Sequence, residues 1–220
     1  TRAPVPGNLS HPQALPDQKH SVFGAETICS RGRSGMGKSA LTELFETEEK
    51  IRILRRVAKR NPVTATTVVA ATGTSKALVS RYLRLLVRNG FCMQRGREYA
   101  WRKNARSLAA KRLLNIDLLE AAVSFPGWAR GIGVYGSYAG GTNTAGSDLD
   151  LWMLADEYTS DLEVPAAGVG KSAGAAAGTE ASLFILTRER LSDLRATDQP
   201  FYSDLVRSSI TLGGESIENS

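Results

Sequence analysis

Apolar residues recur every three to four positions through much of the first half of the chain, which predicts amphipathic helices. A first helix begins at residues 46–49, where three carboxylates suit the positive end of the helix dipole, and it ends at Asn61-Pro62. Its apolar face comprises Ile51, Leu54, Val57 and Ala58. A short second helix has Thr64 or Thr66 as its N-cap and ends at the turn residue Gly73.

A third helix is predicted over residues 76–89, with Ser75 as its N-cap and Gly90 in the usual position after its last turn. Its apolar stripe comprises Leu78, Val79, Tyr82, Leu83, Leu86 and Val87. Residues 91–101 then predict two strands around a glycine-containing turn. Three helices followed by a β-hairpin resemble the winged helix-turn-helix domain, and the resemblance covers residues 43–103.

Charge divides the chain into a basic and an acidic half. Residues 1–116 hold 22 Lys and Arg against 7 Asp and Glu, whereas residues 117–220 hold 6 against 15. Across residues 50–112 there are 17 Lys and Arg and a single acid, Glu98. Cationic side chains neutralise phosphates, so we expect the basic half to bind DNA; the alternative is a solvated face of a protein–protein module. The expected DNA contacts are Ser75, Lys76, Ser80, Arg81, Arg84, Arg95 and Arg97.

The overall composition is that of an ordinary globular protein, with 42% hydrophobic and 23% charged residues. No apolar run reaches the roughly 18 residues that cross a bilayer, so we expect no membrane partner. The two cysteines, Cys29 and Cys92, have no metal-type spacing and indicate a reducing compartment, so we expect a cytoplasmic protein. A homo-oligomer is compatible with the sequence.

Residues 1–42 are rich in proline and glycine and predict a flexible arm. Within it, residues 32–39 fit the phosphate-binding loop pattern GxxxxGK(S/T). Such a loop follows a buried strand, and residues 24–31 make a poor strand. We therefore interpret the match as a flexible segment rather than as the site of a P-loop NTPase.

Connecting helices are predicted over residues 104–127, across the change from basic to acidic, and Lys111 and Arg112 lie outside their apolar face. A short apolar strand over residues 132–135 leads into Gly136-Ser137. Ten residues later a second strand begins with Asp148-Leu149-Asp150. Successive strand residues point to opposite faces, so the two aspartates point the same way. Two like charges on one face are costly unless they are neutralised, and Mg²⁺ can neutralise them while also binding phosphates.

Gly-Ser after one strand and Asp-x-Asp on the next resemble the nucleotidyltransferases of the DNA polymerase β superfamily, in particular the small archaeal-type domain fused behind a winged helix. The resemblance covers residues 128–214. It implies that Gly136 and Ser137 contact the nucleoside triphosphate, ATP or another, and that Asp148 and Asp150 bind one or two Mg²⁺ ions. The reaction it implies is transfer of a nucleotidyl group, such as AMP, to a hydroxyl, with release of pyrophosphate.

The resemblance also implies a third carboxylate on a later strand, over residues 181–186. The family's acid falls at Ser182, and Glu180, two residues earlier on the same face, is the candidate substitute as a catalytic residue. Residues 164–178, rich in alanine and glycine, predict a weak helix or a loose loop. A closing helix over residues 200–206 and an edge strand over residues 210–212 precede a tail, residues 215–220.

The predicted fold class is α+β: an N-terminal winged helix, with three helices and a β-hairpin, followed by a small mixed-sheet nucleotidyltransferase domain. The predicted function is Mg²⁺-dependent nucleotidyl transfer by a DNA-binding protein. The alternative is a DNA-binding transcription regulator whose second domain binds nucleotide, or mediates association, without turnover. The absent third acid favours the regulator, and the intact Gly136-Ser137 and Asp148-x-Asp150 favour the enzyme.

Overall fold

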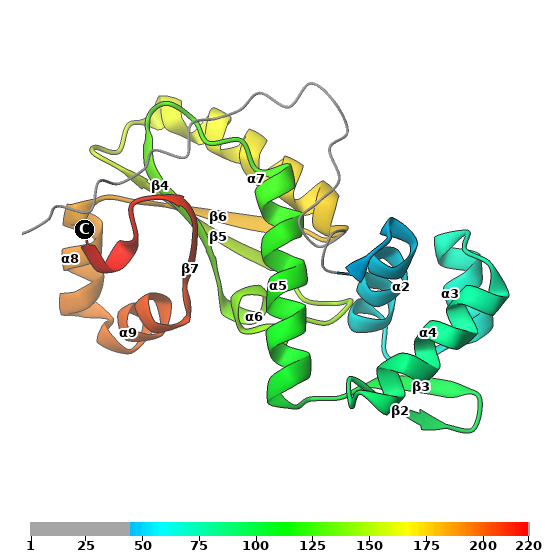
Figure 1. Cartoon of the computed structure of the whole chain (residues 1–220). Coiled ribbons are helices and arrows are strands. Elements are labelled where there is room, and N and C mark those ends of the chain that lie inside the picture. Colours follow the sequence, from blue (N-terminus) through cyan, green and yellow to red (C-terminus); the bar gives the residue numbers. More distant parts are fainter. Residues whose placement is uncertain (1–44, 220) are drawn as a thin grey trace, which may run out of the picture. The chain divides into compact units, whose positions relative to one another are not determined.

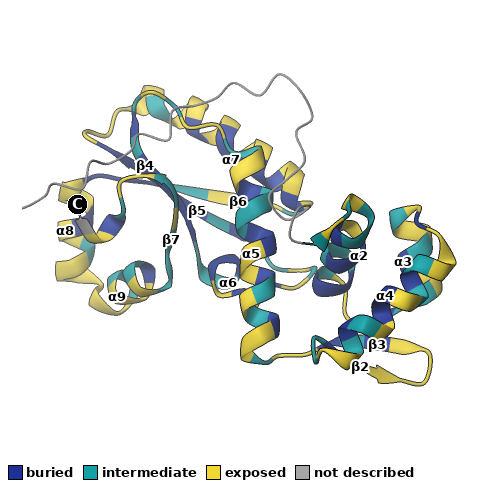
Figure 2. Cartoon of the chain, viewed as in Figure 1, coloured by how far each residue is buried: buried dark blue, intermediate teal, exposed yellow. Residues whose placement is uncertain are grey.

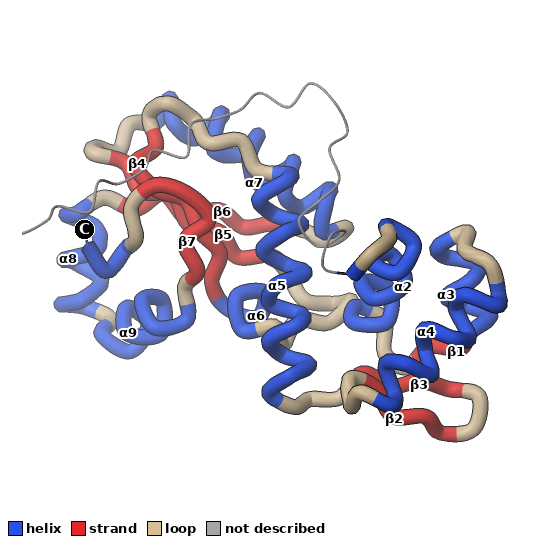
Figure 3. The backbone as a smooth tube through the Cα atoms, viewed as in Figure 1, coloured by secondary structure: helices blue, strands red, loops and turns tan. Residues whose placement is uncertain are grey.

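The computed structural model describes residues 45–219 (Figure 1). The predictions for the N-terminal arm, for Cys29 and for the loop of residues 32–39 lie outside the described residues. A helical region with a small three-stranded sheet is followed by a four-stranded mixed sheet with helices on both faces (Figure 3). This confirms the predicted α+β class.

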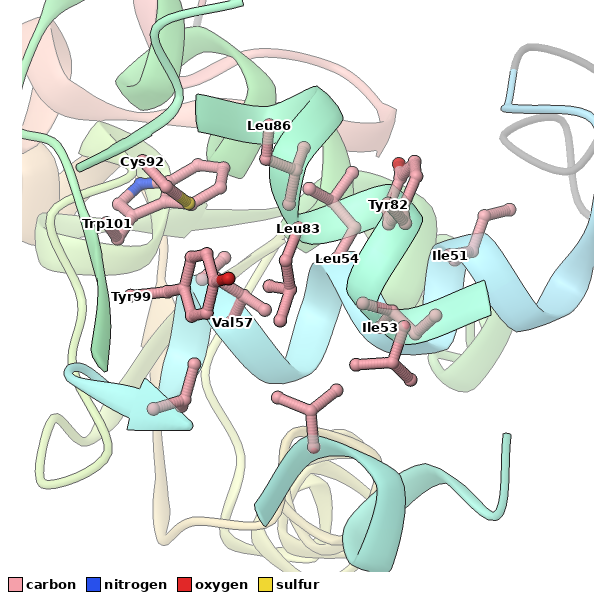
Figure 4. Packing of buried hydrophobic residues seen from close by; sticks show 14 of the residues in the cluster. Ile51, Ile53, Leu54, Val57, Tyr82, Leu83, Leu86, Cys92, Tyr99 and Trp101 are labelled. Carbon is pink, nitrogen blue, oxygen red and sulfur yellow. The ribbon is translucent and has the colours of Figure 1, made fainter. Parts of the chain in front are cut away.

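The first region contains the three predicted helices and the hairpin. Its elements are α2 (Glu48–Lys59), β1 (Val63–Thr64), α3 (Ala65–Thr72), α4 (Lys76–Arg88), β2 (Cys92–Arg95) and β3 (Glu98–Trp101). Strand β3 lies between β1 and β2 and is antiparallel to both. The apolar stripes predicted for the first and third helices meet in one buried cluster, with Val57 and Leu83 fully buried in it (Figure 4).

The predicted caps of these helices are present. The Ser75 hydroxyl accepts a hydrogen bond from the Leu78 N–H at 3.3 Å. Thr64, rather than Thr66, caps α3, as its hydroxyl accepts from the Thr67 N–H at 3.2 Å. Gly73 ends α3 with a φ of +66°, a left-handed conformation in which a Cβ atom is strained.

A single helix, α5 (Ala105–Ala122), replaces the predicted connecting helices. Leu114 belongs to the buried cluster of the first region, and Leu119 to a cluster under the second sheet. The prediction that Lys111 lies outside was wrong, because its side chain is 6% exposed. Helical spacing alone puts a lysine outside, but here a loop of the second region covers it.

The second sheet has the strand order β6-β5-β4-β7. Its strands are β4 (Ala129–Tyr135), β5 (Leu149–Ala155), β6 (Ala181–Leu186) and β7 (Ile210–Gly214). Strands β5 and β6 are parallel, and the other neighbours are antiparallel. Buried residues of α5 and of α7 (Glu163–Ala177) pack on one face, and those of α8 (Arg188–Thr197) and α9 (Gln199–Ser208) pack on the other. The predicted closing helix and edge strand are confirmed as α9 and β7.

Helix α7 is well formed over 15 residues, so a loose loop at this place was wrong. Its small residues lie directly on β6: a Cβ atom at Gly174 would lie 3.2 Å from Cβ of Ala181. Close packing on the sheet therefore outweighs the low helix propensity of glycine. Helix α8 was not predicted, since Leu191 is its one buried residue and leaves no apolar stripe.

The remaining described elements are the short helix α6 (Gly136–Gly140) and two short 3₁₀ turns, Ser160–Leu162 and Ile217–Asn219. Across residues 45–219, no helix has the length and apolar character needed to cross a bilayer.

Candidate functional site

The Gly-Ser pair lies where β4 ends and the short helix α6 (Gly136–Gly140) begins. Gly136 has a φ of +66°, and a Cβ atom there would lie 2.9 Å from Oδ2 of Asp150. The carboxylate therefore lies directly against the backbone of the Gly-Ser turn. Two predicted parts of the site, 14 positions apart in the sequence, are in contact range because β4 and β5 are neighbours.

The two aspartates lie at the start of β5. Asp148 immediately precedes the strand and is exposed, and Asp150 is its second residue and is half-buried. Among the described residues no Lys, Arg or His forms an ion pair with either carboxylate. Burial, and then the charge of Asp148, raise the pKa of Asp150. A divalent cation would relieve both effects, so the two carboxylates fit Mg²⁺, which binds one or two carboxylates together with phosphates and water.

The third position of the site lies on β6. Asp150 and Ser182, where the resemblance places the family's third acid, are direct partners in the parallel register. Glu180 precedes the strand, and its carbonyl oxygen accepts from the Leu149 N–H at 2.9 Å, so the strand pairing extends to it. Within residues 45–219 no three His, Cys, Asp or Glu side chains gather as a metal site. Glu180 thus does not complete a three-carboxylate cluster, and its catalytic role stays a prediction.

Helix α5 holds the loop that joins Gly136-Ser137 to the aspartates. Lys111 Nζ donates to the Asn143 carbonyl oxygen. Asn115 Nδ2 donates to Oδ1 of Asn143 at 3.0 Å and to the carbonyl oxygen of Tyr138 at 2.7 Å. Burial, and next the charge of Lys103, lower the pKa of Lys111 to about 8. Sequence reasoning missed this support, because nothing local distinguishes a buried lysine from an exposed one.

Beside Asp150 and Ser182 lies a shelf of three half-buried aromatic residues, which we call the aromatic shelf: Tyr135, Phe184 and Phe201. Phe201 meets Tyr135 and Phe184 edge-on, with ring centroids 6.5 Å and 6.4 Å apart. Tyr135 is the register partner of Asp150, and Phe184 follows Ser182 by two positions, so both lie on the same face of the sheet as the site. Aromatic faces can stack on a nucleobase. The shelf cannot be found from the local sequence, since α9 supplies one of its members.

The predicted DNA-contacting residues lie on α4 and the hairpin, both of which have exposed surface (Figure 2). Lys76, Arg81 and Arg84 are exposed along α4, and Arg95 and Arg97 are exposed at the hairpin turn. Ser80 is half-buried, and the hydroxyl of Ser75 serves as the helix cap. Of the ion pairs between described residues, none involves these five cations. Their charge is therefore available to a polyanion.

Comparison with known families assigns both regions. Residues 51–96 match the IclR helix-turn-helix domain, and residues 117–200 match the nucleotidyltransferase domain. The chain thus joins a DNA-binding domain to a domain of a group-transferring enzyme family. It combines an IclR-type helix-turn-helix domain with a nucleotidyltransferase domain, which confirms the two resemblances seen in the sequence.

Comparison with solved structures finds similarity over about half of this chain. The crystal structure of a toxin-antitoxin with AMP-PNP is 20% identical over 47% of this chain and 73% of the other, with a TM-score of 0.32. A tri-AMPylated Shewanella oneidensis HEPN toxin in complex with MNT antitoxin is 16% identical over 51% and 76%, with a TM-score of 0.30. No curated protein matches the chain.

Proposed function

We propose that the chain is a DNA-binding, Mg²⁺-dependent nucleotidyltransferase, which moves a nucleotidyl group, AMP in the simplest case, from a nucleoside triphosphate to a hydroxyl. The observation that carries this proposal is the contact between the Gly136 backbone and the Asp150 carboxylate. This contact places two features side by side. One is a turn at a glycine, whose backbone phosphates can approach closely, and the other is a pair of carboxylates with no ion-pair partner among the described residues.

Each residue has a distinct part in the proposed reaction. Gly136 leaves room for the triphosphate beside the backbone, and the Ser137 hydroxyl, which makes no hydrogen bond to the described residues, donates to a phosphate oxygen. Asp148 and Asp150 hold Mg²⁺. When bound, the ion supplies the positive charge that stabilises the attacking and leaving oxygens. The aromatic shelf orients the base. The loop at Asn143, which α5 holds by hydrogen bonds, keeps the phosphate-binding residues and the two aspartates together.

The test is pyrophosphate release from labelled ATP, CTP, GTP and UTP with Mg²⁺, with transfer of label to an acceptor. Asp148→Asn and Asp150→Asn keep the shape of the side chain and remove its charge, so we expect release to fall by at least tenfold. Asp161→Asn, an exposed aspartate in a 3₁₀ turn, is the matched control and should release at the wild-type rate. Equal loss in the control, or none in the site variants, would contradict the proposal.

DNA binding is tested separately. Each phosphate contact that is lost reduces the slope of log affinity against log salt by about 0.9. We expect Arg81→Ala and Arg84→Ala each to weaken duplex binding and flatten this slope, and Arg195→Ala, exposed on α8, to change neither. Salt-independent binding by the wild-type chain would refute the DNA interface.

A regulator that binds nucleotide without turnover is the second candidate, and one observation favours it: the third position of the site holds Ser182 and not a carboxylate. In that case Mg²⁺ and ATP stabilise the chain against unfolding, and that stabilisation depends on Asp150, but no nucleotide releases pyrophosphate.

A further inference from the structure

The hydroxyl of Ser182 occupies an unusual place for a strand residue. Ser182 is directly opposite Asp150 across the parallel β5–β6 pair, and neighbouring strands lie about 4.8 Å apart. Direct partners in a parallel pair point to the same side of the sheet. The Ser182 side chain is exposed, and its hydroxyl makes no hydrogen bond to the described residues. It is therefore free to react and lies beside one of the two carboxylates of the site.

Neighbouring hydroxyls are engaged or shielded. Thr179 Oγ1 donates to the Ser147 carbonyl oxygen at 2.9 Å, and Ser147 Oγ accepts from the Thr144 N–H at 2.8 Å. The Tyr135 phenol is half-buried and its ring lies against Phe201. Three hydroxyls near Asp150 make no hydrogen bond to the described residues: that of Ser137, which faces the proposed phosphate position, that of Tyr135, which is half-buried, and that of Ser182, which is exposed.

We propose that Ser182 is a nucleotidyl acceptor, so that the chain modifies itself; this rests on the proposed nucleotidyl transfer. Ser182 Oγ forms a bond to the α-phosphorus of the bound nucleoside triphosphate. The bond between that phosphorus and the bridging oxygen of the β-phosphate breaks, and pyrophosphate leaves. The hydroxyl proton passes to the carboxylate of Glu180, exposed two residues earlier, and from there to water. No oxidant or further reactant is needed.

The advantage of Ser182 over a free acceptor comes from its attachment. A reacting group that the fold holds beside the site has an effective concentration of up to about 10⁵–10⁸ M when its geometry is productive. A carboxylate at this position, as the resemblance implies for the family, has no proton to lose and forms no stable ester. Serine in place of the family's carboxylate at position 182 thus removes the third acid and supplies a hydroxyl that can accept the nucleotidyl group. The bound nucleotidyl group then occupies the site, so the reaction stops after one turnover.

The experiment incubates the full chain with ATP and Mg²⁺ and measures intact mass and fragment masses. We expect one nucleotidyl group per chain, on the peptide that contains Ser182, and one pyrophosphate released per chain. Ser182→Ala should carry no adduct and should keep its stabilisation by ATP and Mg²⁺ in thermal unfolding. Ser203→Ala, an exposed serine of α9, should be modified as the wild type is.

The outcomes separate this inference from the proposed function. Pyrophosphate release or transfer to another acceptor, with no adduct on Ser182, would overturn the inference and leave the proposed function standing. An undiminished adduct in Ser182→Ala would also overturn it. Absence of adduct, of pyrophosphate and of stabilisation by ATP and Mg²⁺ would overturn both.

Discussion

Replacing Gly136 by alanine tests two properties of this glycine: its left-handed backbone conformation and its close contact with the Asp150 carboxylate. The added Cβ atom has two effects. It strains a backbone whose φ is +66°, and it lies 2.9 Å from Oδ2 of Asp150. Because this oxygen is at the end of a side chain, the carboxylate can turn away at little cost in free energy. This contact therefore affects the orientation of a proposed Mg²⁺ ligand, whereas the backbone strain affects the free energy of unfolding.

Gly73 provides a matched control, since its φ is also +66° and no atom lies within 4 Å of the Cβ position. A left-handed conformation costs an alanine about 1–2 kcal/mol. For a chain of this length that lowers the melting temperature by roughly 2–8 °C. We expect both Gly73→Ala and Gly136→Ala to lose stability in this range.

Nucleotide binding should distinguish the two variants. At a ligand concentration of about 100 times Kd, ATP with Mg²⁺ stabilises the folded chain by about 2.7 kcal/mol, or roughly 5–10 °C. Differential scanning fluorimetry with and without ATP and Mg²⁺ should show this increase for wild type and Gly73→Ala, and little or none for Gly136→Ala. A full increase in Gly136→Ala, or its loss in Gly73→Ala, would refute the reasoning.

Three further predictions concern stability and reactivity. The pKa of Lys111 is lowered to about 8 from 10.5, so the unfolded chain binds more protons between these values. The free energy of unfolding of the wild-type chain should therefore rise as the pH is raised across this window. Urea unfolding at several pH values should show a smaller rise for Lys111→Met. A Cβ atom at Gly133 would lie 2.3 Å from the Trp152 ring, so Gly133→Ala should lose about 1–3 kcal/mol in urea unfolding; an unchanged midpoint would contradict this packing. Burial raises the pKa of Cys92 to about 12, so in a Cys29→Ser chain this thiol should react with a thiol reagent at pH 8 in urea and barely without it.

Local signals in the sequence were sufficient for much of the fold. Caps and left-handed glycines act over three or four residues, so Ser75 and Gly90 could be assigned without knowing what surrounds them, and the cap of the second helix was narrowed to Thr64 or Thr66. The apolar run over residues 181–186 likewise placed the family's third acid at Ser182, which the structure shows to be the register partner of Asp150. The Gly-Ser and Asp-x-Asp motifs could also be found from the sequence. Gly-Ser follows one apolar strand and Asp-x-Asp begins the next, and the apolar residues of both strands are visible in the sequence.

Burial by distant elements could not be predicted in this way. Lys111 is buried because the loop at Asn143 covers it, and α7 is a regular helix because its glycines lie against β6. The aromatic shelf needs Phe201, which α9 supplies 51 positions after Asp150. In each case the free energy depends on which surface closes over the residue, and that surface exists only once the chain has folded.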